Sequence, residues 1–226
     1  MGLEMPFNAT AWNAALEALD ETAGAGKISF VGIHQASGDP GTGLTAGGTE
    51  ATGGSPAYAR LGATWGAAAA GQKSNTNTFA FDVPAGTYGY FTLWNALTGN
   101  TGTQYLGFIP FGGTTPLKGF FSTDTNLAND TLFSIAHGMS NGDRVILYNV
   151  FSEVIPTGIT EGTLYFVVGA ATNTFQISTT SGGAAVDITA LQGGEGFWQR
   201  VVPEVFASQG QITVAAGALV LDATAF

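Results

Sequence analysis

Apolar and polar residues alternate along most of the chain, and a two-residue period of this kind predicts β-strands with one buried face. Turn signals such as Asp39-Pro40-Gly41 and Pro84-Ala85-Gly86 separate these runs and favour reversals of the chain. Many short strands without alternating helices indicate an all-β sandwich or barrel instead of a parallel α/β sheet. The clearest predicted strands lie in KISFVGIHQ (27–35), TFAFDVPAGTYGYFTLWNA (78–96), TQYLGFIPF (103–111) and GQITVAAGALVLDATAF (210–226).

One segment near the start of the chain, residues 8–26, has a helical period instead. Its apolar residues fall at i, i+3, i+4 and i+7, which places them on one face of an α-helix that should dock on the rest of the protein. Asn8 or Thr10 can cap the start of this helix, and Gly24 or Gly26 can end it. The apolar residues are Trp12, Ala15, Leu16 and Leu19.

The segment from residue 120 to 200 has enough strands to form a core of its own. Five or six short strands in about 80 residues suit a small closed barrel. We therefore predict an inserted β-barrel domain over 120–200, and a jelly-roll-like β-sandwich with the short N-terminal helix over 1–119 plus 201–226. The strands of the insert lie in TLFSIA, RVILYNV, TLYFVV, TFQIST, AAVDITA and GFWQRVV.

Composition narrows the classes of function. Charged residues make up 10% of the chain and the formal net charge is −10, with only six lysines and arginines, which are scattered. A nucleic-acid-binding protein needs a basic stripe, so that class is excluded. The chain has no cysteine, which excludes disulfides, thiolate metal sites and cysteine nucleophiles. Since no leader or long apolar stretch is found, we expect a soluble, unsecreted protein without membrane insertion.

The run AHGMSNGDRV (136–145) brings His137 and Asp143 close to a serine, which could indicate a catalytic triad. The same residues suit a turn between strands, because Gly138 and the Asn141-Gly142-Asp143 run tolerate positive φ and Asp143 can accept backbone N–H groups. No local pattern supplies the buried scaffold of a triad, so the turn is the favoured interpretation. His34 stands alone on a predicted strand, which favours a packed or hydrogen-bonded histidine over a metal ligand.

Two loop motifs resemble ligand-binding sequences without matching them. GAGKIS (24–29) is similar to a phosphate-binding loop, but Glu21 stands where the motif needs glycine and Ile28 follows the lysine. DTNLAND (124–130) offers oxygen ligands for Ca²⁺ but lacks the glycine and the distal glutamate of an EF-hand, so a solvated linker is favoured. We therefore assign no cofactor and no metal. The four oxygen-bearing residues are Asp124, Asn126, Asn129 and Asp130.

The tryptophan and tyrosine residues of the first half allow two interpretations. Exposed aromatic rings could form a sugar-stacking platform, whereas rings at strand spacing are more often part of a core. The core interpretation is favoured. The residues concerned are Trp12, Trp65, Trp94, Tyr88 and Tyr90.

Several of these motifs occur in a fixed order. Ile33-His34 ends a strand, and the Asp39-Pro40-Gly41 turn follows it. After this turn come, in order, Gly53-Gly54, Tyr58-Ala59-Arg60, Trp65, the Phe81 to Thr87 turn and the Trp94 to Ala96 strand. This order, with VPEVFASQGQITVAAGALVLDATA (202–225), resembles a family of small virion proteins of tailed bacteriophages, of the tail-fibre or minor-tail type. The resemblance implies a virion-attachment β-sandwich domain over 1–119 plus 201–226.

The interrupting segment has a resemblance of its own. AHGMSNGDRVIL, GITEGTLYFVV, NTFQIS and SGGAAVDIT resemble a small β-barrel module of phage tail fibres, which is similar to the first catalytic-cysteine-half domain of ubiquitin-activating enzymes. Because the chain has no cysteine, this resemblance implies the fold alone and no ubiquitin chemistry.

The two resemblances imply a non-enzymatic structural protein of the tail or capsid surface, made in the bacterial cytoplasm. Its expected partners are other virion proteins and further copies of itself, with a trimer as one option.

A capsid decoration protein is the first alternative. A carbohydrate- or receptor-binding tip is the second, in which exposed aromatics of the insert, such as Tyr148, Phe151 or Trp198, contact a host cell-surface glycan. A cell-wall hydrolase ranks last, because the sequence offers no nucleophile with a local base and no distinctive carboxylate pair.

Overall fold

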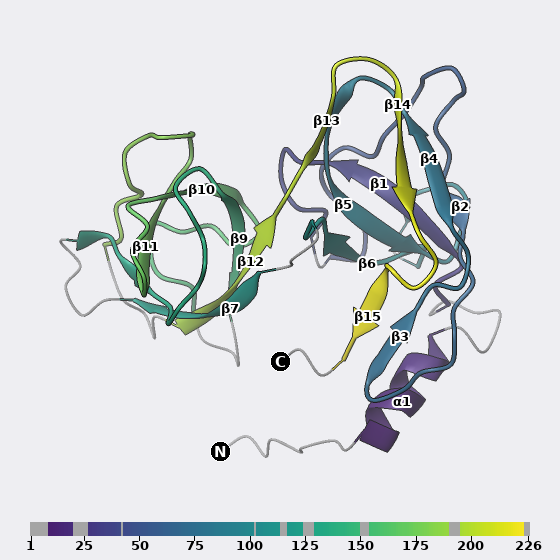
Figure 1. Ribbon diagram of the computed structural model, residues 1–226, viewed down its shortest axis with the longest axis horizontal. Helices are drawn as coiled ribbons and strands as arrows, with labels where there is room; N and C mark the ends of the chain where they lie inside the picture. Colours follow the sequence, from purple (N-terminus) through teal and green to yellow (C-terminus); the bar gives the residue numbers. More distant parts are fainter. Residues whose placement is uncertain are drawn as a thin grey trace.

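The computed structural model confirms the all-β class and contains a sandwich, a closed barrel and one short helix (Figure 1). The sandwich and the barrel lie side by side, and the helix lies below the sandwich in the view of Figure 1. The structure describes residues 9–19, 27–41, 43–101, 103–113, 117–123, 129–149, 154–189 and 195–223.

The larger sheet of the sandwich is antiparallel and is centred on β5 (Gly86–Trp94). On one edge β5 pairs with β1 (Phe30–Gln35), which in turn pairs with β2 (Leu61–Gly62). On the other edge it pairs first with β13 (Glu204–Phe206) and then with β6 (Tyr105–Pro110). The sheet therefore combines strands from both sides of the barrel segment.

The second layer of the sandwich consists of two antiparallel strand pairs. β4 (Phe79–Val83) pairs with β14 (Gly210–Val214), and β3 (Gln72–Ser74) pairs with β15 (Val220–Asp222). Alternate residues of β4 and β14 are buried, as their two-residue period predicts. The sandwich core draws on both layers and includes Val31, Ile33, Phe79, Phe81, Val83, Tyr88, Ile212 and Val214.

Helix α1 (Ala9–Ala18) docks on β3, as its amphipathic pattern predicts. Glu17 forms an ion pair with the buried Lys73, and Asn13 Oδ1 accepts a hydrogen bond of 2.7 Å from the backbone N–H of Gly71. Leu16 is 5% exposed. Thr10 lies inside the helix instead of capping it. The other proposed caps, Asn8, Gly24 and Gly26, fall outside the described residues, as does the side chain of Trp12.

The barrel is closed, in the strand order β10-β11-β8-β7-β12-β9. Closure gives each barrel strand two neighbours, so no strand forms an open edge of the sheet. Its interior is apolar and includes Val145, Leu147, Val167, Phe175, Ile177 and Trp198. The strands are β7 (Lys118–Thr123), β8 (Leu132–Phe133), β9 (Arg144–Asn149), β10 (Leu164–Val168), β11 (Thr174–Ser178) and β12 (Glu195–Val201).

The chain enters and leaves the barrel through neighbouring strands. β7 and β12 pair with each other, with Lys118 opposite Gln199. The backbone N–H of Arg200 also donates to the carbonyl of Leu117 at 2.8 Å. From β12 the chain passes directly into β13 of the sandwich (Figure 1).

A buried apolar cluster joins the barrel to the sandwich. Tyr90 of β5, Ile146 of β9 and Val201 of β12 are each 2% exposed or less. Phe108 and Tyr148 pack beside them, with ring centres 6.3 Å apart. Within the described ranges, no helix has the length and apolarity that a membrane crossing needs.

Candidate functional site

The AHGMSNGDRV run forms a turn, as the favoured interpretation predicts. Gly138 and Gly142 have φ angles of 68° and 91°, and Asp143 Oδ2 accepts a hydrogen bond of 2.8 Å from the backbone N–H of Ser140. His137 is 4% exposed and uses both ring nitrogens locally. Its Nδ1 accepts from the N–H of Met139 at 3.0 Å, and its Nε2 donates to the Thr174 carbonyl at 3.2 Å. His137 and Asp143 therefore serve the turn separately.

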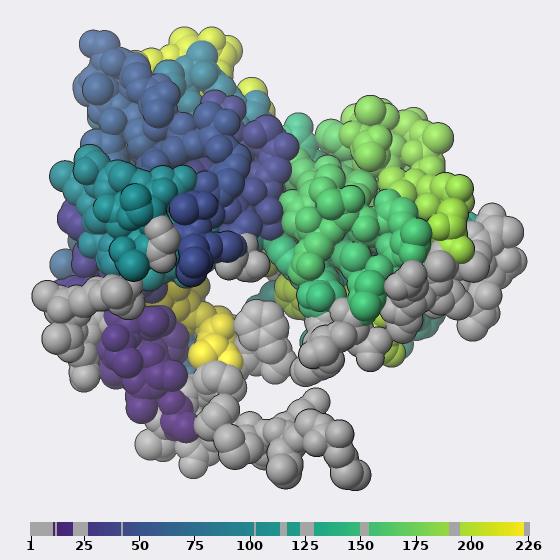
Figure 2. Space-filling model, turned by 180° about the vertical axis from the view of Figure 1, so that it is seen from behind, coloured from purple at the N-terminus to yellow at the C-terminus, as the bar shows by residue number. Residues whose placement is uncertain are grey.

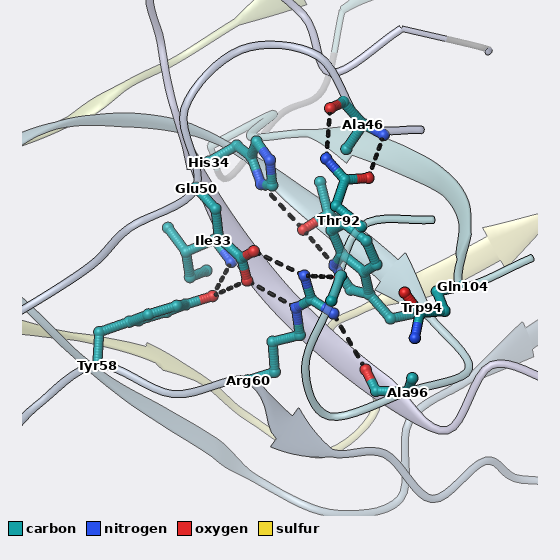
Figure 3. A network of polar contacts seen from close by, with 12 residues as sticks. Ile33, His34, Ala46, Glu50, Tyr58, Arg60, Thr92, Trp94, Ala96 and Gln104 are labelled. Carbon is teal, nitrogen blue, oxygen red and sulfur yellow. Dashed lines mark hydrogen bonds and ion pairs between the residues drawn. The ribbon is translucent and has the colours of Figure 1, made fainter. Parts of the chain in front are cut away.

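A largely buried polar network lies at the β1 edge of the sandwich and is centred on Glu50 and Arg60 (Figure 3). Arg60 donates two hydrogen bonds of 2.7 Å to the Glu50 carboxylate, one from Nε and one from Nη2. The hydroxyl of Tyr58 donates to Glu50 at 3.0 Å and accepts from the N–H of Ile33 at 2.8 Å. Burial raises the pKa of this hydroxyl, and the nearby Glu50 charge raises it further. Tyr58 therefore stays a neutral hydrogen-bonding group.

Arg60 also forms hydrogen bonds with the chain that follows β5. Its two Nη atoms donate to the carbonyls of Ala96 and Gly99 at 3.1 and 2.8 Å. The guanidinium lies over the ring of Trp94, which adds a cation–π contact. With a side chain only 5% exposed, Arg60 thus uses its donor fork on a carboxylate and two carbonyls.

His34 extends the same network on β1. Its Nδ1 lies 3.1 Å from the Thr92 hydroxyl, which accepts a hydrogen bond of 2.8 Å from Trp94 Nε1. Burial lowers the pKa of His34 to about 4; the Glu50 charge opposes this effect and Arg60 adds to it. His34 is therefore neutral at physiological pH, and the prediction of a packed, hydrogen-bonded histidine is confirmed.

The arrangement of this network is structural. Each charged or titratable group in it contacts a backbone group, an oppositely charged group or a ring of the same unit, which holds the loop around Glu50 and the chain after Trp94 against the sheet. The sequence analysis singled out Tyr58 and Arg60 only through the family resemblance, expected Trp94 in the core, and missed Glu50.

A second polar cluster lies where the sandwich meets the barrel, and Asp39 is its centre. The hydroxyl of Tyr148, on barrel strand β9, donates a hydrogen bond to Asp39. The backbone of Asp39 contacts the barrel too, since its N–H donates to the Gly162 carbonyl at 3.4 Å. Burial raises the pKa of Asp39; hydrogen bonds from Tyr148 and the Gly41 backbone oppose this shift, and the charge of Glu161 adds to it.

Two more tyrosines of the sandwich stand close to Asp39. Burial raises the pKa of Tyr90 and of Tyr105, and the Asp39 charge raises both further. The Tyr105 hydroxyl donates to the Gly41 carbonyl at 2.7 Å, whereas the buried Tyr90 hydroxyl finds no hydrogen-bond partner among the described residues. The Asp39-Pro40-Gly41 sequence predicted a turn, whereas the turn residues of the structure are Ala36 and Ser37, just before it. The docking role of the Asp39 carboxylate was not predicted.

The predicted ligand-contact aromatics of the barrel need correction. Trp198 is 2% exposed, and its Nε1 donates to the Ser134 hydroxyl at 2.8 Å; it fills the barrel core and is not an exposed contact. Tyr148 is half-buried and faces the sandwich through Asp39 and Phe108. Phe151 lies outside the described residues. The prediction failed because β12 is buried on both faces, so its aromatic residues are not divided into a buried row and an exposed one.

Other apolar side chains of the barrel are exposed. Phe120, Phe133 and Ile135 are 51%, 41% and 75% exposed. They border a hollow of about 530 Å³, which also reaches Lys118 and Glu195. A hollow with apolar walls and a few polar groups is a typical site for a ligand or a partner side chain.

The remaining sequence motifs are structural or lie outside the description. In DTNLAND, Asp130 Oδ1 accepts a hydrogen bond of 2.8 Å from the N–H of Ile188, while Asp124 and Asn126 fall outside the described residues. Among the residues that are described, no group of three His, Asp or Glu side chains could hold a metal ion. The glycines of GAGKIS are not described.

The core interpretation of the aromatic residues holds where they are described. Trp94, Tyr88 and Tyr90 are fully buried, and the half-buried Trp65 donates from Nε1 to the Ile28 carbonyl at 2.9 Å. The fold and its polar clusters thus define an all-β protein that consists of a sandwich and a barrel, with buried polar clusters around Arg60 and Asp39. Comparison with protein-family models, curated proteins and solved structures finds no match to the chain.

Proposed function

We propose that the chain is a non-enzymatic structural component of a tailed-bacteriophage virion, of the minor-tail or tail-fibre type. The ordered motifs from Ile33-His34 to Trp94 support this proposal through their resemblance to small virion proteins. The resemblance of the 120–200 segment to a tail-fibre barrel module supports it separately. In this role the sandwich attaches to the particle and the barrel projects from it.

The observation that carries the proposal is the packed junction between sandwich and barrel. Asp39 and Tyr148 link the two across the junction, and Tyr90, Ile146 and Val201 bury an apolar cluster beside them. A junction that combines apolar burial with a polar contact resists relative motion of the two units. A structural component that must present one unit at a fixed angle to the other needs this property.

A second candidate, a carbohydrate- or receptor-binding tip, is favoured by the hollow bordered by Phe120, Phe133 and Ile135. Exposed aromatic rings beside Lys118 and Glu195 suit stacking and hydrogen bonding to a sugar. This candidate would place the ligand on the barrel, at residues other than Tyr148 and Trp198.

Gold-labelled antibody staining of intact particles from the producing phage tests the proposal. Label on the tail or its tip is the expected result. Label spread over the head would replace the proposal with the capsid decoration alternative, and particles without label would refute a virion role. If label lies at the tip, glycan binding that is lost in Phe120→Ala and kept in Val205→Ala would favour the second candidate, since Val205 is an exposed residue of the sandwich.

A further inference from the structure

One outer face of the barrel carries large apolar side chains. β7 and β12 run side by side (Figure 1), and Phe120 lies opposite Phe197 in their register, with ring centres 5.8 Å apart. Phe133 of β8 lies opposite Ser122, two residues further along β7. Paired residues and alternate residues share one face of a sheet, so the three rings stand on the same side. That side is the outside, because Trp198, the neighbour of Phe197, fills the barrel core.

This outer surface is open to solvent. Phe120, Phe133 and Ile135 are all exposed and border the hollow of about 530 Å³; we call the surface that they form the β7–β8 face. The β9 side of the barrel is covered by the sandwich instead, through Tyr148 and Ile146, and Figure 2 shows the green barrel against the blue part of the sandwich. An exposed apolar surface of this kind typically marks an interaction site.

The closed sheet limits how a partner can bind to this surface. Each barrel strand already has two neighbours, so the barrel has no free edge on which a partner could add a strand. A partner must therefore pack on the side chains of the β7–β8 face. Such a partner needs an apolar surface of its own, with charges that match those at the border of the face.

Lys118 and Glu195 stand at opposite ends of this surface, on β7 and β12, and both are exposed. The Phe120–Phe197 pair lies midway between them in the strand register. Four residues along a strand span about 13 Å, so the two charges are too far apart to pair with each other. Neither forms an ion pair within the part of the chain that the structure describes.

The other titratable groups beside these charges are already placed. His137 also borders the hollow, but it is buried and uses both ring nitrogens in its turn. Lys118 borders two further hollows toward the sandwich, of about 440 and 300 Å³, where Glu204 and Asp222 are the acidic side chains. Lys118 forms no ion pair with either of them. The β7–β8 face thus has one free cation and one free anion among its described residues.

A second copy of the same surface matches both charges at once. A twofold axis that lies in the contact plane and crosses the strands at Phe120 places Lys118 of each copy opposite Glu195 of the other. Two ion pairs then flank the apolar side chains, which meet between them. The net charge of −10 makes two copies repel each other, and this repulsion is weakest where the contact surface itself carries no net charge.

We propose that the β7–β8 face binds the same face of a second copy of this chain in a twofold dimer. The contact covers the exposed apolar side chains and leaves the junction between barrel and sandwich untouched. The proposal does not depend on a virion role. It assigns the hollow to a second copy of the chain instead of a glycan.

Light scattering during size-exclusion chromatography of the full-length chain tests the proposal. We expect the mass of two copies for the wild type. Ile135→Glu places a carboxylate in the apolar contact and should have the mass of one copy at the same concentration. Val205→Glu places the same group on a residue of the sandwich that is 70% exposed, and this control should remain a dimer. A wild type of one copy or of three copies, or a dimer of Ile135→Glu, would overturn the proposal.

Charge reversal tests the twofold pairing independently. Lys118→Glu and Glu195→Lys each bring like charges together, and each should raise the dissociation constant of the dimer roughly tenfold. An equimolar mixture of the two variants has opposite charges at both ends of the contact and should associate about as tightly as the wild type. A disturbance within one copy, such as repulsion of Lys118→Glu by Glu204 and Asp222, would persist in the mixture. Sedimentation velocity measures the constants, and a mixture as weak as the single variants would refute the pairing.

Two controls complete the test. Thermal denaturation should give each variant a melting temperature close to that of the wild type, because all the substituted residues are exposed. If Ile135→Glu fails to fold, the charge-reversal mixture still decides between the outcomes. A monomeric wild type that binds a cell-wall glycan, with binding lost in Phe120→Ala, would overturn the proposal and assign the hollow to the sugar.

Discussion

The guanidinium carbon of Arg60 lies 3.3 Å from the centre of the Trp94 ring, while its nitrogens hold Glu50 on one side and the Ala96 and Gly99 carbonyls on the other. One side chain thus joins the Gly-rich loop before it, the strand beneath it and the turn after that strand. Residues so connected are expected to lose stability together when the guanidinium is removed.

Replacing Arg60 by Ala should destabilise the protein by about 3–5 kcal/mol, because it leaves the Glu50 carboxylate without its partner in a largely buried place. Arg60→Lys should recover only part of this loss, since an ammonium group lacks the planar donor fork. Urea denaturation measures both. Lys27→Ala, a half-buried lysine outside the network, is the control and should change stability little. An equal loss of stability in Lys27→Ala would show that the guanidinium donors of Arg60 have no special role.

His34 should make the protein less stable in mild acid. Its pKa is about 4 in the folded state against 6.5 as the ordinary value, so between these values the unfolded chain binds more protons. Stability therefore falls as the pH drops, by about 1.6 kcal/mol between pH 6.5 and 5 from this group. The measurement is the urea midpoint at both pH values in wild type and His34→Gln. A fall of the same size in the variant would assign the effect to other groups.

Asp39 should have the opposite pH dependence. Its pKa is raised in the folded state, chiefly by burial, so the stability it contributes is present at low pH and is lost as the pH rises through the folded pKa. Asp39→Asn keeps an acceptor for Tyr148 without the charge and should melt at a higher temperature than wild type at pH 7, with a smaller difference at pH 4. A variant less stable than wild type at pH 7 would contradict this account.

Tyr148→Phe removes the hydroxyl that donates to Asp39 and should cost about 1–3 kcal/mol, because a half-buried carboxylate loses a donor. The loss should be larger at pH 7 than at pH 4, since only the ionised carboxylate needs the bond. Tyr165→Phe is the matched control: its hydroxyl accepts from the N–H of Thr160 at 2.8 Å and has no carboxylate partner among the described residues, so its loss should not vary with pH. Thermal denaturation of the two variants at both pH values compares them.

Gly162 fixes how closely the sandwich and the barrel approach. A Cβ atom there would lie 2.7 Å from both carboxylate oxygens of Asp39, and the residue has a φ of +70°. Gly142 also has a positive φ, of +91°, but a Cβ atom there would meet nothing within 4 Å. Gly142→Ala should therefore cost about 1–2 kcal/mol from backbone strain alone, and Gly162→Ala should cost more. Equal melting temperatures of the two variants would show that the junction yields to the added methyl group.

The strands could be predicted where apolar and polar residues alternate because only one face of the strand is buried. In β4, Phe79, Phe81 and Val83 are buried and the residues between them are not, so the sequence pattern alone indicates the strand and its orientation. Local turn chemistry was equally readable at Gly138 and Gly142, where a positive φ is needed. These features depend on neighbours in the sequence and need no knowledge of the tertiary structure.

The polar clusters could not be predicted because their members meet only in three dimensions. Asp39 and Tyr148 are 109 residues apart, and no local pattern distinguishes this aspartate from any other turn aspartate. Trp198 was expected on the surface, but both Phe197 and Trp198 are buried, the tryptophan inside the barrel and the phenylalanine against Phe120. A strand buried on both faces loses the alternation on which the prediction rests.

The strand pairing of the sandwich has a consequence for the order of folding during synthesis. Every strand partner of the barrel lies between residues 118 and 201, whereas β3 and β4 must wait for β15 and β14 near the end of the chain. The N–H of Leu219, for example, donates to an Asn75 oxygen 144 residues earlier. The barrel can therefore close on the ribosome first, and its closure brings β6 and β13 together, which shortens the loop that the last two strands must bridge.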